Sequence, residues 1–187
     1  MGVPTIDTGP MTVEDFYALT DSRPDNEKWE LIEGDPVLNA WPTYRHQRIV
    51  MNVVQLMLSA LRERPDLEVL AGLSVRTGPN SLPVPDILVR PRVFLPGREC
   101  DDMIVAFEIL SPSTVSHDLQ WKRAAYTKLP SLAHYVVIAQ DTVEVVIYDR
   151  SSGFQERRIS DEGTSVEILS PAISLPLKEI YQDANLS

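Results

Sequence analysis

The chain has 187 residues, of which 43% are hydrophobic and 24% are charged. This length suffices for one domain with its own core, and this composition excludes an intrinsically disordered chain. The net charge of −10 argues against a nucleic-acid partner, because phosphate backbones bind to cationic surfaces. The charge is uneven, since residues 1–35 sum to −7 and residues 129–187 to −5, whereas residues 36–128 sum to +2. The middle of the chain therefore permits phosphate binding.

Membrane and secretory classes are not indicated. No stretch approaches the roughly 18 consecutive apolar residues of a membrane helix. The first residues have neither the basic nor the apolar region of a signal peptide. Cys100 is the only cysteine, which excludes an internal disulfide and a multi-cysteine zinc site. We therefore expect a cytoplasmic protein with no membrane partner, and nothing in the sequence indicates an organic cofactor.

The first third of the chain predicts two helices and a hairpin. Thr12, followed by two acids, predicts a capped helix over residues 12–21. Residues 28–38 are typical of a hairpin that turns at Gly34-Asp35. Residues 46–64 are the clearest helix, because their apolar side chains recur at helical spacing and a proline follows.

Beyond residue 66 the apolar period changes to that of strands. Strands are predicted over residues 67–72, 73–78, 84–89, 103–110, 134–140, 142–149, 154–159 and 165–169. A crossover helix is predicted over 113–130 and a last helix over 176–183. This order predicts one α/β (α+β) domain over residues 1–187, with a central mixed sheet flanked by helices.

Two acids lie in apolar strand segments. Glu108 lies inside the run 103–110, which is apolar on both faces, as in a central buried strand. An unpaired carboxylate there costs several kcal/mol, so it must be protonated, paired or bound to a metal. Asp86 follows Pro85, at the position where a strand begins. Two carboxylates on neighbouring strands are the hard oxygen ligands that Mg²⁺ prefers. The alternative interpretation is a turn residue and an ion-paired strand residue.

The crossover helix adds three polar side chains on one stripe. Asp118, Lys122 and Tyr126 recur every four residues, and the helix follows the strand of Glu108 after a short connection. Its first turns are therefore expected near the end of that strand. The alternative is an ordinary helical ion pair between Asp118 and Lys122, worth a few tenths of a kcal/mol.

Together these segments resemble a known family. The segments that match in order are WELIEGDPV (29–37), YRHQRIVMNVVQLMLSAL (44–61), PVPDILV (83–89), AFEILSPSTVSHDLQWKRAAYTKLP (106–130) and HYVVIAQ (134–140). Their order resembles that of the Uma-type restriction endonucleases, bacterial proteins assigned to the PD-(D/E)XK nuclease superfamily. The resemblance covers residues 12 to 181. It implies a restriction endonuclease-like core and Mg²⁺- or Mn²⁺-dependent hydrolysis of DNA.

The resemblance also implies roles for individual residues. Asp86 matches the aspartate of the "PD" element, and Glu108 matches the acid of the (D/E)XK element, so both are expected to bind the metal. The main-chain carbonyl of Ile109 is the expected third ligand. The lysine of the superfamily pattern is replaced by Leu110. Lys122 matches the helix lysine that takes its place in this family, and it would orient the attacking water or neutralise charge on the phosphate.

Four further residues match the family in supporting positions. Glu33 matches the acid of "ELIEG" and is expected to add to the metal shell. His46 matches the histidine at the start of the long helix, near a phosphate or water. Asp118 and Tyr126 are expected to support the site or to anchor the helix.

Other polar and aromatic residues receive ordinary interpretations. His117 and His134 are interpreted as surface or partly buried histidines. The tryptophans Trp29, Trp41 and Trp121 are interpreted as core or interface residues rather than base-stacking platforms. Arg90 and Arg92 are interpreted as solvated loop residues, with phosphate contact as the alternative.

The leading hypothesis is a Mg²⁺-dependent endonuclease acting on DNA, as a homodimer that cuts both strands. The rival is a catalytically inactive dimer of the same fold, a binding or regulatory module in which Glu108 and Lys122 neutralise each other. A third hypothesis is a metal-dependent hydrolase of another substrate, because an acidic protein repels DNA.

Overall fold

A computed structural model gives the fold and describes residues 9–24, 26–110 and 117–186. The helices are α1 (Val13–Thr20), α2 (Tyr44–Ala60), α3 (His117–Tyr126) and α4 (Leu177–Ile180). The first six strands are β1 (Lys28–Ile32), β2 (Asp35–Asn39), β3 (Leu67–Ala71), β4 (Ser74–Val75), β5 (Ile87–Pro91) and β6 (Glu99–Cys100). The remaining strands are β7 (Val105–Leu110), β8 (His134–Ala139), β9 (Val145–Asp149), β10 (Gln155–Ile159), β11 (Ser165–Leu169) and β12 (Ala172–Pro176).

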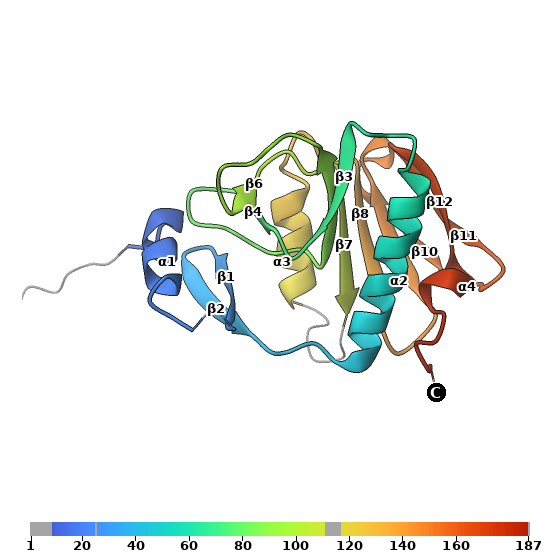
Figure 1. The fold of residues 1–187 in the computed structure, drawn as a ribbon, viewed down its shortest axis with the longest axis horizontal. Coiled ribbons are helices and arrows are strands. Elements are labelled where there is room, and N and C mark those ends of the chain that lie inside the picture. Colours follow the sequence, from blue (N-terminus) through green and yellow to red (C-terminus); the bar gives the residue numbers. More distant parts are fainter. Residues whose placement is uncertain (1–8, 25, 111–116, 187) are drawn as a thin grey trace, which may run out of the picture.

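A six-stranded mixed sheet forms the centre of the protein, with the strand order β10-β9-β8-β7-β5-β3 (Figure 1). The central pair β7 and β8 is parallel, and the other neighbouring pairs are antiparallel. The parallel pair needs a crossover, which α3 provides. The predicted fold class, a mixed sheet with flanking helices, is confirmed.

Side chains alternate between the two faces of the sheet, and each face has its own cover. In β7, Phe107 and Ile109 pack in a core formed with α2, α4 and the β11–β12 hairpin. Ala106 belongs to the opposite core, which includes Tyr126 of α3. Glu108 alternates in the same sense as Ala106, so the fold directs this carboxylate to the α3 face.

The long helix α2 begins at Tyr44, two residues before the predicted start. Thr43 accepts a hydrogen bond from the His46 N–H at 3.2 Å and thereby caps the helix. The helix ends at Ala60, and residues 61–63 form a turn before Pro65. The cap fixes the start of α2 and thereby the position of His46 in its first turn.

The hairpin β1–β2 and helix α1 lie at one end of the sheet (Figure 1). A small core of Val13, Phe16, Leu31 and Leu82 joins them to the loop before β5. Gly34, at φ +92°, makes the predicted turn, and an added Cβ would overlap the Pro10 side chain. The turn is therefore closed in a way that only glycine permits.

Several short elements differ from the predictions. The strand predicted over 73–78 contracts to Ser74–Val75, which pairs with the unpredicted β6. The unpredicted β12 pairs with β11, and the predicted last helix contracts to α4. In the described part of the chain, no helix is both long and apolar enough to cross a membrane.

His134 is buried and joins β8 to the β11–β12 hairpin, contrary to its interpretation as a surface or partly buried histidine. Its Nε2 accepts hydrogen bonds from the backbone N–H groups of Leu169 at 3.1 Å and Ser170 at 3.3 Å. The proton of the neutral ring therefore lies on Nδ1, which faces Asp149 at 3.5 Å. Burial lowers the pKa of His134, against the opposing effect of Asp149 and with a small contribution from Arg157.

Replacing His134 with leucine should lower the free energy of unfolding by about 1–3 kcal/mol at pH 7.5, because two backbone N–H groups lose their acceptor. The native pKa is lowered, so this stabilisation is present above the unfolded value of about 6.5 and is lost as the pH falls below it. Urea denaturation at pH 7.5, 6.5 and 5.5 measures the difference between wild type and His134→Leu. His134→Gln, which keeps an acceptor that does not titrate, is the control. A difference that grows on acidification would contradict the assignment.

Candidate active site

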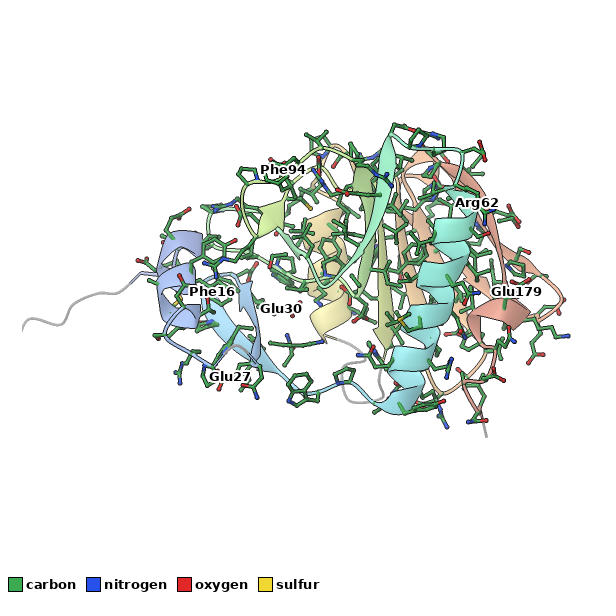
Figure 2. All side chains as sticks on the ribbon, viewed as in Figure 1. Phe16, Glu27, Glu30, Arg62, Phe94 and Glu179 are labelled. Carbon is green, nitrogen blue, oxygen red and sulfur yellow. The ribbon has the colours of Figure 1, made fainter. Side chains whose placement is uncertain are left out.

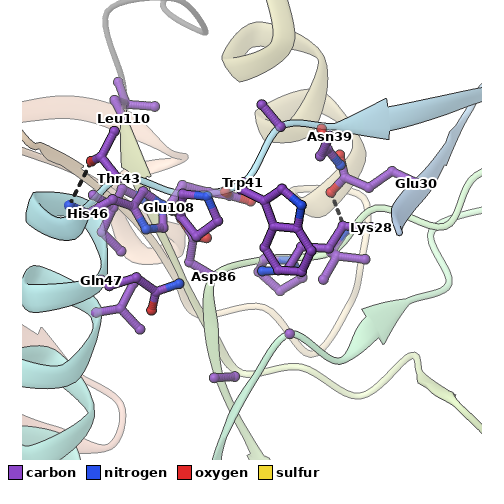
Figure 3. A pocket seen from close by; sticks show the side chains of 18 of the residues that line it. Lys28, Glu30, Asn39, Trp41, Thr43, His46, Gln47, Asp86, Glu108 and Leu110 are labelled. Carbon is purple, nitrogen blue, oxygen red and sulfur yellow. Dashed lines mark hydrogen bonds and ion pairs between the residues drawn. The ribbon is translucent and has the colours of Figure 1, made fainter. Parts of the chain in front are cut away.

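A cleft of about 760 Å³ opens between the β1–β2 hairpin, the start of α2 and the ends of β5 and β7 that face them (Figure 3). Four of the predicted site residues line it, namely His46, Asp86, Glu108 and Lys122. Ile109, whose carbonyl is an expected ligand, lines it as well. The fold thus brings together residues that are up to 76 positions apart in the chain.

Asp86 lies at the bend immediately before β5, as predicted for a strand entry. Its Oδ2 accepts a hydrogen bond from the Ile109 N–H at 2.8 Å and lies 3.2 Å from His46 Nε2. No described residue bonds to its other oxygen, and the side chain is a quarter exposed. Asp86 is therefore held through one oxygen and retains the other for a ligand.

The backbone of β7 adds a possible ligand at the same place. In a strand, the N–H and C=O of one residue point to the same side. Because the Ile109 N–H donates to Asp86, the Ile109 carbonyl also faces the β5 side, where Asp86 lies.

Lys122 lies between two buried carboxylates. Its Nζ is 2.9 Å from Glu30 Oε1 and 3.2 Å from Glu108 Oε1, and it donates to the Val84 carbonyl at 3.4 Å. The three charged side chains are only 8%, 4% and 9% exposed for Lys122, Glu30 and Glu108. Glu30 also accepts a hydrogen bond from the Val84 N–H at 2.7 Å, so the triad joins β1, β7, α3 and the loop before β5.

Glu108 has a second partner on the same helix. The Tyr126 hydroxyl donates to Glu108 Oε1 at 3.1 Å, one helical turn beyond Lys122. Burial raises the pKa of Glu108 to about 8; Lys122 opposes this shift, whereas Asp86 and Glu30 add to it. The same burial, with the charge of Glu108, raises the pKa of Tyr126, which stays a hydrogen-bond donor.

The charges of the cleft do not balance. Four carboxyl groups line the cleft, those of Glu27, Glu30, Asp86 and Glu108, against the two ammonium groups of Lys28 and Lys122. Buried carboxylates in such excess must take up a proton or a cation. The arrangement therefore favours binding of a positive ion beside Asp86 and Glu108.

Glu30 was missed by the sequence analysis, which expected Glu33 in this role. Glu33 lies in the tight turn after β1, at φ 51°, and its side chain is exposed and outside the cleft. Glu30 lies within β1, and its side chain points from the hairpin toward the interior (Figure 2). A strand alternates its faces whereas a turn does not, so only the strand residue is directed inward. The sequence signal was the position of Glu30 within the predicted hairpin strand, whereas Glu33 adjoins the glycine of the turn.

Some other residues named from the sequence lie outside the cleft or have side chains outside the described part of the structure. Asp118 belongs to α3, but its side chain lies outside the described part of the structure, as does that of His117. Arg90 is not a solvated loop residue; it is 1% exposed and pairs with Glu68 and Asp102. Arg90 thus forms structural ion pairs near the end of β5, whereas Asp86 precedes the start of that strand.

The described residues contain no group of three or more His, Cys, Asp and Glu side chains placed to hold a metal ion. The donors available are two carboxylates and one backbone carbonyl. Mg²⁺ ordinarily uses one or two protein carboxylates and keeps several waters, so this donor set fits that ion and does not fit an all-protein cage.

Comparisons with known proteins agree with the fold. A sequence model of the family Uma2, described as "Putative restriction endonuclease", matches residues 13–178. A crystal structure described as "a putative nuclease belonging to DUF820", from Anabaena variabilis ATCC 29413, superposes with a TM-score of 0.73. It is 20% identical in sequence, and the match covers 92% of this chain and 98% of that chain. No curated protein matches the chain.

Removing the ammonium of Lys122 should destabilise the fold, because the buried carboxylates of Glu30 and Glu108 would lose their cationic partner. The substitution Lys122→Met should lower the free energy of unfolding by about 3–5 kcal/mol at pH 8.5, since two buried carboxyl groups lose their partner. The double variant Lys122→Met/Glu108→Gln should recover part of this loss. Urea denaturation measures both values. The control is Arg98→Met, which removes an exposed pair with Asp21 and should change little. Equal stability of Lys122→Met and wild type would contradict the triad.

Proposed function

Because the chain belongs to the Uma2 family of restriction endonucleases, we propose that it is a nuclease that hydrolyses DNA phosphodiester bonds with Mg²⁺ or Mn²⁺. The observation that carries this proposal is the meeting of Asp86, Glu108 and Lys122 in one cleft. These residues come from the bend before β5, from β7 and from α3, and their separation along the chain gives no local reason for them to converge.

Asp86 and Glu108 are the proposed carboxylate ligands, with the Ile109 carbonyl beside them. The fit rests on the unbonded oxygen of Asp86 and on the carboxylate excess of the cleft. A divalent cation bound there would polarise the phosphodiester and lower the pKa of an attacking water. Its charge would also favour the ionised form of Glu108, which the protein alone disfavours.

The chain's own residues position these groups. The Ile109 N–H and His46 hold one oxygen of Asp86, so the carboxylate presents the other to the cleft. Tyr126 donates to Oε1 of Glu108, and Lys122 contacts both oxygens of that carboxylate, at 3.2 Å and 3.4 Å. Ligands fixed by such hydrogen bonds lose little freedom on binding, and they keep their orientation.

Lys122 is proposed to supply the cation that the superfamily pattern places on the strand, at the position of Leu110. Its ammonium has a long bond, at 3.4 Å to the Val84 carbonyl, beside shorter contacts with Glu30 and Glu108. It also lies 3.4 Å from the second oxygen of Glu108. Exchange of that long bond for a phosphate oxygen would bring a fixed positive charge to the reacting group. Glu30 would hold the ammonium in place during this exchange. Cleavage of both strands of a duplex would require two such sites, as in a homodimer.

A second candidate is a noncatalytic module of the same fold. It is favoured by the saturation of Lys122, whose described partners already match the three donors of an ammonium. In that case the triad is a structural ion pair, and the cleft binds no cation.

Nuclease activity is the direct test of the proposal. Wild type should cleave DNA with Mg²⁺ or Mn²⁺ but not with EDTA, measured on linear, circular and single-stranded substrates. The variants Asp86→Asn, Glu108→Gln and Lys122→Met should each lower the rate at least about 100-fold, because each removes a ligand or a stabilising charge.

The matched pair Glu30→Gln and Glu33→Gln separates the two acids of the β1–β2 hairpin. Glu30→Gln should lower cleavage, because it weakens the hold on Lys122, and Glu33→Gln should leave the rate unchanged. Cleavage that survives both Asp86→Asn and Lys122→Met would overturn the site assignment.

Binding of Mn²⁺ should depend on pH through Glu108. Because the native pKa is raised to about 8, the cation must displace a proton below that value. The association constant should therefore fall by up to about tenfold per pH unit as the pH drops from about 8 toward 6. Calorimetry in two buffers with different ionisation enthalpies measures both the affinity and the released proton. Glu108→Gln should release no such proton, and a wild-type affinity that stays constant over this range would refute the assignment.

A further inference from the structure

Trp41 is a large apolar side chain at the mouth of the cleft. We propose that it stacks on an unpaired nucleobase next to the scissile phosphate, so that the substrate class is single-stranded or locally unpaired DNA. This inference rests on the proposed nuclease function and adds the form of the substrate to it. It also revises the interpretation of Trp41 as a core or interface residue.

The exposure of Trp41 is unusual for its type. Its side chain is 66% exposed, and it belongs to none of the hydrophobic cores of the described residues. It nevertheless lines the same cleft as Asp86 and Glu108, and in the view of Figure 3 its ring is drawn between Asp86 and Lys28. A tryptophan that does not pack inside the protein presents a flat face to whatever enters the cleft.

The backbone that bears Trp41 is anchored on both sides. Asn39 before it ends β2, which pairs with β1 across the hairpin. Thr43 after it caps α2 and donates to the buried Gln140 at 3.1 Å. Pro42 restricts the dihedral angles between these anchors. The backbone of Trp41 is therefore held at a defined place, so little conformational entropy is lost when a base stacks on the ring.

The cations near Trp41 suit a phosphate backbone. Lys28 Nζ lies 5.9 Å from the centre of the Trp41 ring, and Lys28 lines the cleft. Nearby, the Arg23 guanidinium lies 5.6 Å from the Trp29 ring. Elsewhere, six arginines of the described residues pair with carboxylates, namely Arg45, Arg64, Arg76, Arg90, Arg98 and Arg158. Cations also lie over rings elsewhere in the described residues, but Lys28 and Trp41 are the pair of which both members line the cleft. A cation beside an exposed aromatic ring is a combination that binds single-stranded nucleic acids.

The charge of the protein favours a single strand over a continuous duplex. Duplex binding depends on many Lys and Arg contacts to phosphates, and this chain has a net charge of −10. Stacking on an aromatic face supplies affinity without such charge and accepts any base. A cleft with one exposed tryptophan and few cations is therefore matched to a short unpaired segment.

The test is binding of labelled oligonucleotides, measured by fluorescence anisotropy in EDTA so that no cleavage occurs. The probes are a 20-nucleotide oligothymidine, a blunt duplex of equal length and a 20-nucleotide oligouridine. Wild type should bind oligothymidine more tightly than the duplex. Trp41→Ala should weaken this binding about tenfold or more, and Trp41→Phe should retain most of it. Phe94→Ala is the matched control, because Phe94 is 89% exposed and lies away from the cleft (Figure 2).

Each other outcome overturns the inference. Equal binding by Trp41→Ala and wild type, a preference for the blunt duplex, or no binding of any probe would exclude the stacking role. Tighter binding of oligouridine than of oligothymidine would assign the platform to RNA. A change of oligomeric state in Trp41→Ala, seen by light scattering, would make the ring an interface residue. Cleavage of DNA by wild type with Mn²⁺ is measured in a separate assay. Cleavage without the expected effect of Trp41→Ala on binding would leave the proposed function intact and exclude only the stacking role.

Discussion

The contact of Lys122 with Glu30 and Glu108 is the interaction on which the rest of the site depends. It joins a helix, the central strand and the N-terminal hairpin. A buried ammonium between two carboxylates is costly to desolvate, and removal of any member leaves a charge that the interior cannot solvate. The hairpin is therefore held over the cleft by charge as well as by the small core around Phe16.

The same triad explains why the cleft suits a cation. Burial raises the pKa of Glu108 to about 8, and the neighbouring carboxylates of Asp86 and Glu30 add to the shift against the opposing charge of Lys122. A structure selected for stability alone would replace such a cluster with apolar side chains, which are often more stabilising. Excess negative charge beside an open oxygen of Asp86 is the arrangement expected where a metal ion is to be bound. Because the protein is acidic overall, its substrate should be one whose binding does not need a broad cationic surface.

Much of the fold and half of the site followed from the sequence, for physical reasons. Glu108 and Asp86 were conspicuous because acids are rare in apolar strands, and the four-residue spacing of Lys122 and Tyr126 placed both on one stripe of the crossover helix. In the structure both side chains contact Glu108. Glu30 was not found, because its distinction from Glu33 depends on where the strand ends and the turn begins. The burial of His134 and the exposure of Trp41 were also missed. Both depend on which elements pack against them, and local pattern says little about that.

The central claim is that Asp86, Glu108 and the Ile109 carbonyl surround one cation within reach of Lys122. The most direct measurement is a crystal structure with Mn²⁺ at saturating concentration, collected where the ion scatters anomalously. We expect one anomalous peak between Asp86 and Glu108, which is lost in Asp86→Asn crystals prepared in the same way. A cleft without a peak, or a peak only at other acids such as Glu68 and Asp102, would contradict it.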